Sequence, residues 1–332
     1  MALAEKLNLR VLTNMKVAAA FPTDHRLHAA PPANRFGPET LKMIADADVI
    51  LSLDWLDLSG LLKTAYGSRP VTARIIQVSC DQHSHRGWSM DHQGLPPIDV
   101  YLMCEPEAAV PMLLEASKAR TASVPDRPVT KAPAVSGDAV SMSGVAHALL
   151  AATKGADVCY THLPIGWSGA YSHFNHPLDY LGAEGGAGVG SGPGIAVGAA
   201  LALKGSGRLP IGVLGDGDFL MANTAVWTAA HYRIPCLIVV CNNRSFFNDE
   251  LHQERVAKER SRPVENRWIG MRIGDPDIDL AAMAKAMGAV GIGPVTRPAD
   301  LQPAIDKGIE TVRNGGVCLI DARVLPGYDA EG

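Results

Sequence analysis

Residues 211–250 read IGVLGDGDFLMANTAVWTAAHYRIPCLIVVCNNRSFFNDE, and this stretch decides the fold. The apolar run 211–214 predicts a buried strand, and the Gly-Asp-Gly sequence at 215–217 is expected to end that strand in a tight turn. An amphipathic pattern over 219–232 predicts a helix, and the apolar run 236–241 predicts a second strand. Strand, helix and strand in this order form a βαβ unit, in which a right-handed crossover makes the two strands parallel.

Oxygen-bearing groups follow both predicted strands. Asp216 comes after the first strand, and Asn243 and the Ser245 carbonyl come after the second. Because parallel strands end at the same carboxyl edge of a sheet, these groups are expected to meet where such folds bind ligands. One carboxylate, one amide oxygen and one carbonyl form a hard ligand set that suits Mg²⁺ or Ca²⁺, and Mg²⁺ usually keeps phosphate and water as its other ligands.

The residues around Asp216 are expected to contact the phosphate. Gly215 and Gly217 let the backbone approach an anion closely, and the amides of Asp218 and Phe219 open the following helix. The stretch therefore predicts a diphosphate bridged by a metal ion. The simpler alternative is that both motifs are ordinary turns and that Asp216 caps a helix.

The combination of the two motifs resembles a known signature. Gly-Asp-Gly at 215–217 and Asn242-Asn243 are separated by 24 residues. This pattern resembles the thiamin-diphosphate signature of the acetolactate synthase, benzoylformate decarboxylase and pyruvate decarboxylase-like superfamily. The resemblance implies an α/β fold with two doubly wound domains and mainly parallel sheets, with thiamin diphosphate and Mg²⁺ as cofactors.

Composition sets broad limits on the function. Of the 332 residues 47% are apolar and 19% are charged, with a net charge of −4 and no basic stripe, so a globular enzyme is expected and nucleic acid is not an expected partner. No apolar run is long enough for a membrane span, and no secretory signal pattern is visible. Six scattered cysteines without a CxxC pair indicate free thiols in the cytoplasm.

The first predicted domain covers residues 1–120 and alternates strands with helices, which indicates a parallel α/β sheet. Its FPTDH at 21–25 and ADVIL at 47–51 resemble the superfamily's middle domain, whose usual first strand and helix have no counterpart here. We therefore expect the missing piece on another polypeptide. The predicted strands are 11–13, 49–52, 74–79 and 100–102, and the predicted helices are 39–45, 57–66 and 107–119.

Histidines at 83 and 85, with Trp88, lie in the stretch 81–97. A metal or aromatic site is one interpretation, and an exposed polar loop after a strand is the other. Some relatives hold FAD on this domain, but no residue pattern here identifies such a site.

A linker over 121–136, rich in Pro, Ser and Thr, leads to the second predicted domain at 137–327. Here the glycine-rich run GAEGGAGVGSGPGIAVGAAL at 182–201 leads into a helix predicted over 195–203. No strand directly precedes the glycines, which argues against a Rossmann loop. The other predicted elements are helices 141–152, 280–287 and 298–313, a charged helix ending near 260, and strands 156–161, 289–290 and 317–321.

The glycine-rich run resembles the superfamily's GGMGFGLPAAIGAAL. By that match the Ala187 carbonyl would contact the aminopyrimidine, Gly188 would line the cofactor, and Val189 would be the apolar wedge that holds the cofactor bent.

Several polar residues are candidates for the substrate pocket. His173 or Asn175, in the loop 163–180, could bind phosphate or substrate, and loop packing is the alternative. Phe246, Asn248 and Asp249 follow the Asn-Asn motif and are candidate pocket groups, while the alternative for residues 248–250 is a helix cap. The segment 260–278 is expected to be an active-site cover or an interface loop.

The resemblance also implies an activating Glu on a pyrimidine-binding domain, which no segment of this chain matches. We therefore expect the large subunit of a split enzyme, a lyase or transferase that makes or breaks a C–C bond next to a carbonyl: a 2-oxoacid decarboxylase, a carboligase or a 2-hydroxyketone lyase. A small subunit would supply the pyrimidine domain in a heterotetramer or larger assembly. The alternatives are a non-catalytic or regulatory subunit and a flavin-dependent 2-oxoacid oxidase.

Overall fold

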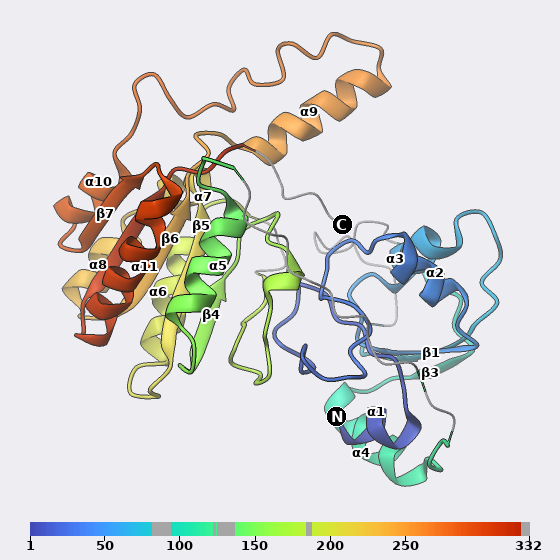
Figure 1. Cartoon of the computed structure of the whole chain (residues 1–332). Coiled ribbons are helices and arrows are strands. Elements are labelled where there is room, and N and C mark those ends of the chain that lie inside the picture. The colour runs from blue at the N-terminus through green and yellow to red at the C-terminus, as the bar shows by residue number, and fades with distance from the viewer. Residues whose placement is uncertain (82–93, 122–123, 125–136, 184–187, 327–332) are drawn as a thin grey trace. The chain divides into compact units, whose positions relative to one another are not determined.

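The computed structural model describes residues 1–81, 94–121, 124, 137–183 and 188–326. The described residues fall into two compact units, one formed within 1–130 and one within 131–331 (Figure 1). Both units are α/β structures with parallel sheets, as the sequence predicts. No helix in the described part of the chain is long and apolar enough to cross a membrane.

The first unit is built on a parallel sheet of order β1-β2-β3. The side chains of Leu62 and Tyr66 pack on Ile75 to form its core, and Asp57 caps the helix that carries the first two. The strands are β1 (Val49–Leu53), β2 (Arg74–Val78) and β3 (Val100–Leu102), and the helices are α1 (Ala2–Leu7), α2 (Pro38–Ala45), α3 (Leu58–Tyr66) and α4 (Pro106–Ala116).

The strand predicted over 11–13 is wrong. Val11 makes only an isolated bridge to His28. Two backbone hydrogen bonds of Val11, from its N–H to Leu27 and from the Ala29 N–H to its carbonyl, make this bridge, and the Thr13 hydroxyl lies 2.9 Å from the buried His28 ring. The histidines at 83 and 85, Trp88 and most of the predicted linker lie outside the described residues.

The second unit has a five-stranded parallel sheet of order β4-β5-β6-β8-β7, covered by helices on both faces (Figure 1). Helices α5 and α11 pack together on one face, and α6, α8 and α10 cover the other. The strands are β4 (Val158–His162), β5 (Leu209–Gly215), β6 (Cys236–Cys241), β7 (Val290–Val295) and β8 (Val317–Ala322). The helices are α5 (Met142–Ala152), η1 (Gly169–Tyr171), α6 (Gly192–Ala202), α7 (Asp216–Met221), α8 (Ala225–His231), α9 (Phe247–Glu259), α10 (Leu280–Ala286) and α11 (Pro298–Arg313).

Strand β6 is the centre of this core. All six of its residues are buried, which is why the sequence reads as an uninterrupted apolar run. Ile238 and Val240 pack in the cluster formed with α6, α8 and α10, whereas Leu237 lies against Gly308 of α11. Because side chains alternate along a strand, one run of apolar residues fills both layers of the unit.

The tight turn predicted at Gly215-Asp216-Gly217 is wrong. Strand β5 continues through Gly215, and α7 begins directly at Asp216, with neither glycine at positive φ. The helix predicted over 219–232 is two helices, α7 and α8, because the chain leaves helical geometry at Ala222. There the Asn223 side chain donates a hydrogen bond to the Leu220 carbonyl, which closes the end of α7.

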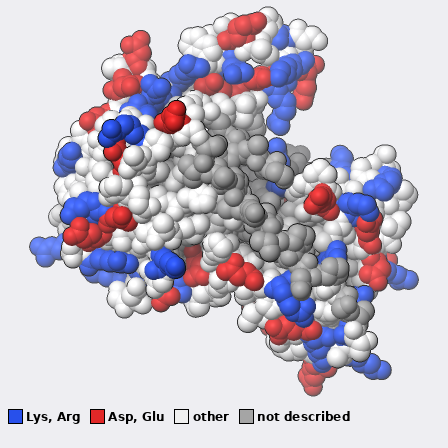
Figure 2. Space-filling model, in the orientation of Figure 1, with Lys and Arg blue, Asp and Glu red and all other residues white. Residues whose placement is uncertain are grey.

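Charged side chains are mixed on the surface. On the face shown in Figure 2, Lys and Arg lie among Asp and Glu, and no large patch of one sign is seen there among the described residues. This mixing agrees with the net charge of −4.

Two glycines of the second unit should respond in opposite ways to replacement by alanine. A Cβ on Gly291 of β7 would lie 2.0 Å from the Ala281 carbonyl oxygen, so Gly291→Ala should lower the free energy of unfolding by about 1–3 kcal/mol as α10 is displaced. A Cβ on Gly198 of α6 meets no atom within 4 Å, so Gly198→Ala should raise it by about 0.5–1 kcal/mol. Urea denaturation of both variants checks the pair, and equal shifts would contradict this account of α10 packing.

Candidate functional site

The predicted metal ligands lie at the carboxyl edge of the second unit's sheet. Asp216 follows β5, and Asn243 lies two residues after the end of β6. These strands are neighbours, with Gly215 paired to Cys241 at their ends. The Asp216 side chain is buried, with only 3% of the residue exposed.

One backbone donor joins the two motifs. The Ser245 N–H donates to Asp216 Oδ2 at 3.1 Å and to Asn243 Oδ1 at 2.9 Å. Since both oxygens share this donor, they lie close together at the edge of the sheet. The Ser245 carbonyl accepts no backbone hydrogen bond from the described residues.

This donor set fits a divalent cation. A carboxylate oxygen, an amide oxygen and a carbonyl are the oxygen ligands that Mg²⁺ and Ca²⁺ take. No cluster of three or more His, Cys, Asp or Glu that could hold a metal occurs in the described part of the chain. The remaining ligands of a cation at Asp216 would therefore come from a bound phosphate and from water.

Burial changes the acidity of this carboxyl group. Desolvation raises the pKa of Asp216 to about 6, although backbone hydrogen bonds from Gly217, Arg244 and Ser245 favour the ionised form. A bound cation would stabilise the carboxylate and lower its pKa again.

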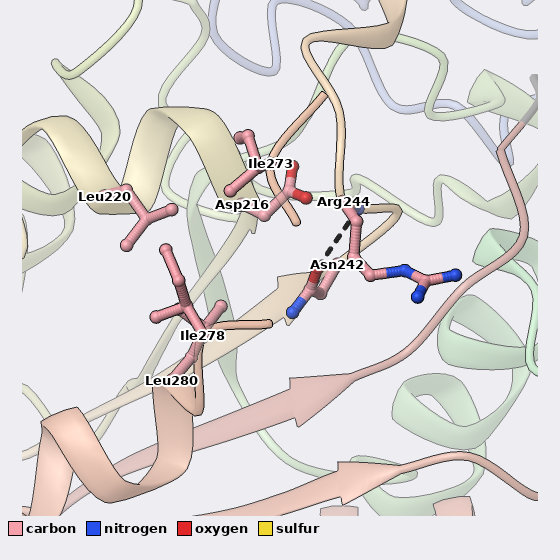
Figure 3. A pocket seen from close by; sticks show the side chains of 7 residues that line it. All are labelled: Asp216, Leu220, Asn242, Arg244, Ile273, Ile278 and Leu280. Atoms are coloured by element: carbon pink, nitrogen blue, oxygen red, sulfur yellow. Dashed lines mark hydrogen bonds between the residues drawn. The ribbon is translucent and has the colours of Figure 1, made fainter. Parts of the chain in front are cut away.

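The first asparagine of the motif has a structural role. Asn242 donates through Nδ2 to Asp321 Oδ1 at 2.9 Å, and its backbone N–H donates to the Ala322 carbonyl at 2.8 Å. Its side-chain oxygen accepts from the Arg244 N–H at 3.1 Å (Figure 3). The turn that carries Asn243 is thus fixed to the end of β8.

Sequence reasoning missed Asp321, and one signal could have found it. An acidic residue at the end of the apolar strand VCLIDA is unusual, and here it is fully buried. Burial raises the pKa of Asp321, while the hydrogen bond from Asn242 and the nearby Arg323 lower it.

Gly217 is required by packing. A Cβ at this position would lie 2.3 Å from the Phe246 ring, so the ring lies directly on the Gly217 backbone. The structure thus brings Phe246 against the Gly-Asp-Gly motif. Phe219 is fully buried in the core, so only its backbone could face a ligand at this edge.

The glycine-rich run also reaches the Gly-Asp-Gly motif. Gly188 and Val189 are exposed, whereas Ala187 lies outside the described residues. Asp218 Oδ1 accepts hydrogen bonds from the N–H groups of Gly190 at 2.6 Å and Gly192 at 3.2 Å.

The remaining pocket candidates are less enclosed. His173 and Asp249 are exposed, and Asn248 is half-buried. The acidic residue with the most contacts at the start of α9 is Glu250, which the sequence analysis did not single out. It is buried, accepts a hydrogen bond from the Ser245 hydroxyl, and lies 3.7 Å from Arg272.

The segment after α9 returns to the turn at residues 242–245, which carries the predicted ligands Asn243 and Ser245 and is called the metal-ligand turn below. The Phe246 N–H donates to the Met271 carbonyl and the Ile273 N–H donates to the Arg244 carbonyl, forming a bridge between Ser245 and Arg272. Figure 1 shows α9 and this segment projecting from the sheet of the second unit.

A small pocket lies beside Asp216. Polar and apolar side chains line it together: Asp216, Asn242, Arg244, Leu220, Ile273, Ile278 and Leu280 (Figure 3).

The second unit also matches a known protein family. Residues 164–322 match the family described as "Thiamine pyrophosphate enzyme, C-terminal TPP binding domain". Acetolactate synthase isozyme 3 large subunit from Escherichia coli K12 is 27% identical over 154 residues, which cover 46% of this chain and 25% of that protein.

Two solved structures share the fold of nearly the whole chain. A thiamine diphosphate-dependent 4-hydroxybenzoylformate decarboxylase from Rhodococcus jostii RHA1 superposes with a TM-score of 0.72 at 23% identity, covering 99% of this chain and 58% of that one. Benzoylformate decarboxylase from Polynucleobacter necessarius gives a TM-score of 0.75 at 20% identity, covering 99% and 59%. This chain therefore spans less than two thirds of these relatives. The match of residues 164–322 and the Escherichia coli relative support membership of the thiamin-diphosphate-dependent enzyme superfamily, and the two solved structures share the fold.

Proposed function

We propose that this chain binds the diphosphate of thiamin diphosphate through Mg²⁺ held by Asp216, Asn243 and the Ser245 carbonyl. The observation that carries the proposal is the shared Ser245 N–H, which holds Asp216 Oδ2 and Asn243 Oδ1 on one donor. The match of residues 164–322 to a thiamine pyrophosphate-binding domain supports the choice of cofactor.

Thiamin diphosphate, when bound, supplies a carbanionic centre and an electron sink for bonds next to a carbonyl. The protein's own contribution is to bind and orient it. Asp216 and Asn243 would hold the cation, whose positive charge would offset the charge of the diphosphate, and Asp216 itself is only 3% exposed. Gly188 and Val189, exposed at the turn before α6, are proposed to line the cofactor further along its length, together with Ala187.

The reaction we propose is decarboxylation of a 2-oxo acid, carboligation, or cleavage of a 2-hydroxyketone, on a small carbonyl substrate. The names of the relatives, an acetolactate synthase subunit and two decarboxylases, support this range. His173, Phe246, Asn248 and Asp249 are proposed pocket groups. Phe246 is the best supported, because its ring lies on the Gly-Asp-Gly backbone.

We further propose that a second polypeptide supplies the pyrimidine-binding part and its activating Glu. The E. coli relative is named a large subunit, which supports an assembly of more than one kind of polypeptide. In this arrangement residues 1–120 are the middle domain and 137–327 the diphosphate-binding domain, joined by 121–136.

The carboxylate of Asp216 should decide metal-dependent binding. Asp216→Ala removes one of two side-chain oxygens from the cation, so the affinity for thiamin diphosphate in Mg²⁺ should fall by roughly tenfold or more. Isothermal titration calorimetry, repeated with EDTA, measures this loss. If Asp216 only stabilises the start of α7, Asp216→Ala should lower the free energy of unfolding by about 1 kcal/mol and leave the cofactor affinity unchanged.

Asp300 offers a matched control. It is half-buried at the start of α11 and pairs with Arg297 at 2.7 Å; α11 follows β7, which β8 separates from β6. Asp300→Ala removes the same charge, and it should leave cofactor binding at the wild-type value. An equal loss in both variants would mean that net charge, and not a metal site, sets the affinity.

The split arrangement predicts a difference between the lone chain and the complex. The chain alone should bind thiamin diphosphate weakly and turn over 2-oxo acids poorly. Co-purification with a polypeptide encoded beside it should restore activity, assayed by CO₂ release and 2-hydroxyketone formation. Full activity of the chain alone contradicts the need for a partner, and absence of cofactor binding in the complex favours a non-catalytic subunit.

A further inference from the structure

Asp218 connects two segments that are far apart in the sequence. Its Oδ1 accepts hydrogen bonds from the Gly190 N–H at 2.6 Å and the Gly192 N–H at 3.2 Å. Gly190 lies in the glycine-rich turn at residues 188–191, Gly192 is the first residue of α6, and Asp218 belongs to α7. Hydrogen bonds from backbone N–H groups to an ionised carboxylate are stronger than hydrogen bonds between neutral groups.

The bonds also complete the N-terminus of α6. The residue at the cap position, Ser191, has no capping hydrogen bond, because its hydroxyl donates to the Gly188 carbonyl at 2.8 Å. The first turn of α6 contains no acidic residue. The carboxylate of Asp218, contributed by another helix, therefore satisfies the Gly192 amide and offsets the positive end of the helix dipole.

Close packing shows that the contact is specific. A Cβ on Gly192 would lie 2.0 Å from Asp218 Oδ2, and a Cβ on Gly190 would lie 2.9 Å from Met221 Cβ. Gly190 also has a φ of +98°, a backbone conformation that residues with a side chain rarely adopt. The turn thus rests on α7 at a distance that only glycine permits. The other oxygen, Oδ2, is buried without a hydrogen-bond partner among the described residues.

Helix α7 presents its two acidic residues to different segments. Positions two apart on a helix are separated by roughly 200° around the axis, so their side chains point in nearly opposite directions. Asp216 accepts from the Ser245 N–H beyond β6, and Asp218 accepts from Gly190 before α6. About half a turn of α7 therefore separates the residue that contacts the turn after β6 from the residue that contacts the glycine-rich turn.

We infer that Asp218 is a positioning residue, which holds the glycine-rich turn at a fixed distance from the metal-ligand turn so that one rigid cofactor can contact both. The inference rests on the proposed function, since it assumes that both turns face thiamin diphosphate. Asp218 itself acts through the backbone of Gly190 and Gly192. Its Oδ1 is occupied by these two amides.

The test compares two ligands on the chain together with its partner polypeptide in Mg²⁺. Inorganic pyrophosphate needs only the metal-ligand turn, whereas thiamin diphosphate needs both turns. Asp218→Ala should weaken thiamin diphosphate binding by roughly tenfold or more and change pyrophosphate binding by less than about twofold. Amide hydrogen exchange at Gly190 and Gly192 should become roughly tenfold faster.

Two further variants sharpen the test. Asp218→Asn keeps the Oδ1 acceptor, so it should stay within about threefold of wild type for both ligands. Asp57→Ala is the matched control: Asp57 caps α3 in the first unit through a 2.8 Å bond from the Gly60 N–H, and its loss should change neither affinity.

The inference is overturned if Asp218→Ala binds thiamin diphosphate like wild type, or if it loses both ligands equally. Unchanged exchange at Gly190 and Gly192 also overturns it. If the wild-type chain binds neither ligand with or without its partner, the proposed function itself fails. That result differs from the failure of the inference alone, in which wild type binds and the variant matches it.

Discussion

The hydrogen bonds from the Ser245 N–H to Asp216 and Asn243 are the constraint on which the site depends. The Asp216 carboxylate oxygen and the Asn243 amide oxygen lie together because β5 and β6 are adjacent, parallel and paired to their last residues. Asn242 anchors the turn to Asp321 on β8, and Glu250 accepts from the Ser245 hydroxyl. The positions of Asp216, Asn243 and Ser245 are thus set by contacts within the protein.

The sequence predicted the strands of the second unit well, because buried parallel strands are read from apolar runs. The run at 236–241 matches β6, and helix 298–313 matches α11. The failures have a common cause. Gly-Asp-Gly was expected to turn because glycine permits it, yet a strand can pass straight into a helix, and Gly217 serves the packing of Phe246. Residue type alone does not distinguish conformational need from steric need.

The contacts that the sequence did not predict join distant segments. Asn242 and Asp321 are 79 residues apart, and Asp218 and Gly190 are 28 apart. A local pattern contains no information on such a pair. Only the burial of a charge indicates that a partner must exist, since an acidic residue is rarely buried unpaired. An aspartate in an apolar strand is therefore a prediction that a donor lies nearby, although the identity of the donor requires the fold.

The contacts of this chain also explain why its residues indicate the cofactor more fully than the substrate. The groups proposed for the diphosphate are backbone amides and carbonyls held by the sheet, together with two side chains, Asp216 and Asn243. Such a set depends on how the fold places strand ends, and that fold is shared with solved structures at 20–23% identity. Substrate choice depends instead on exposed loop side chains such as His173 and Asp249, which the core does not constrain. The physical chemistry of this chain therefore specifies the anchored end of the cofactor more strongly than the molecule on which the enzyme acts.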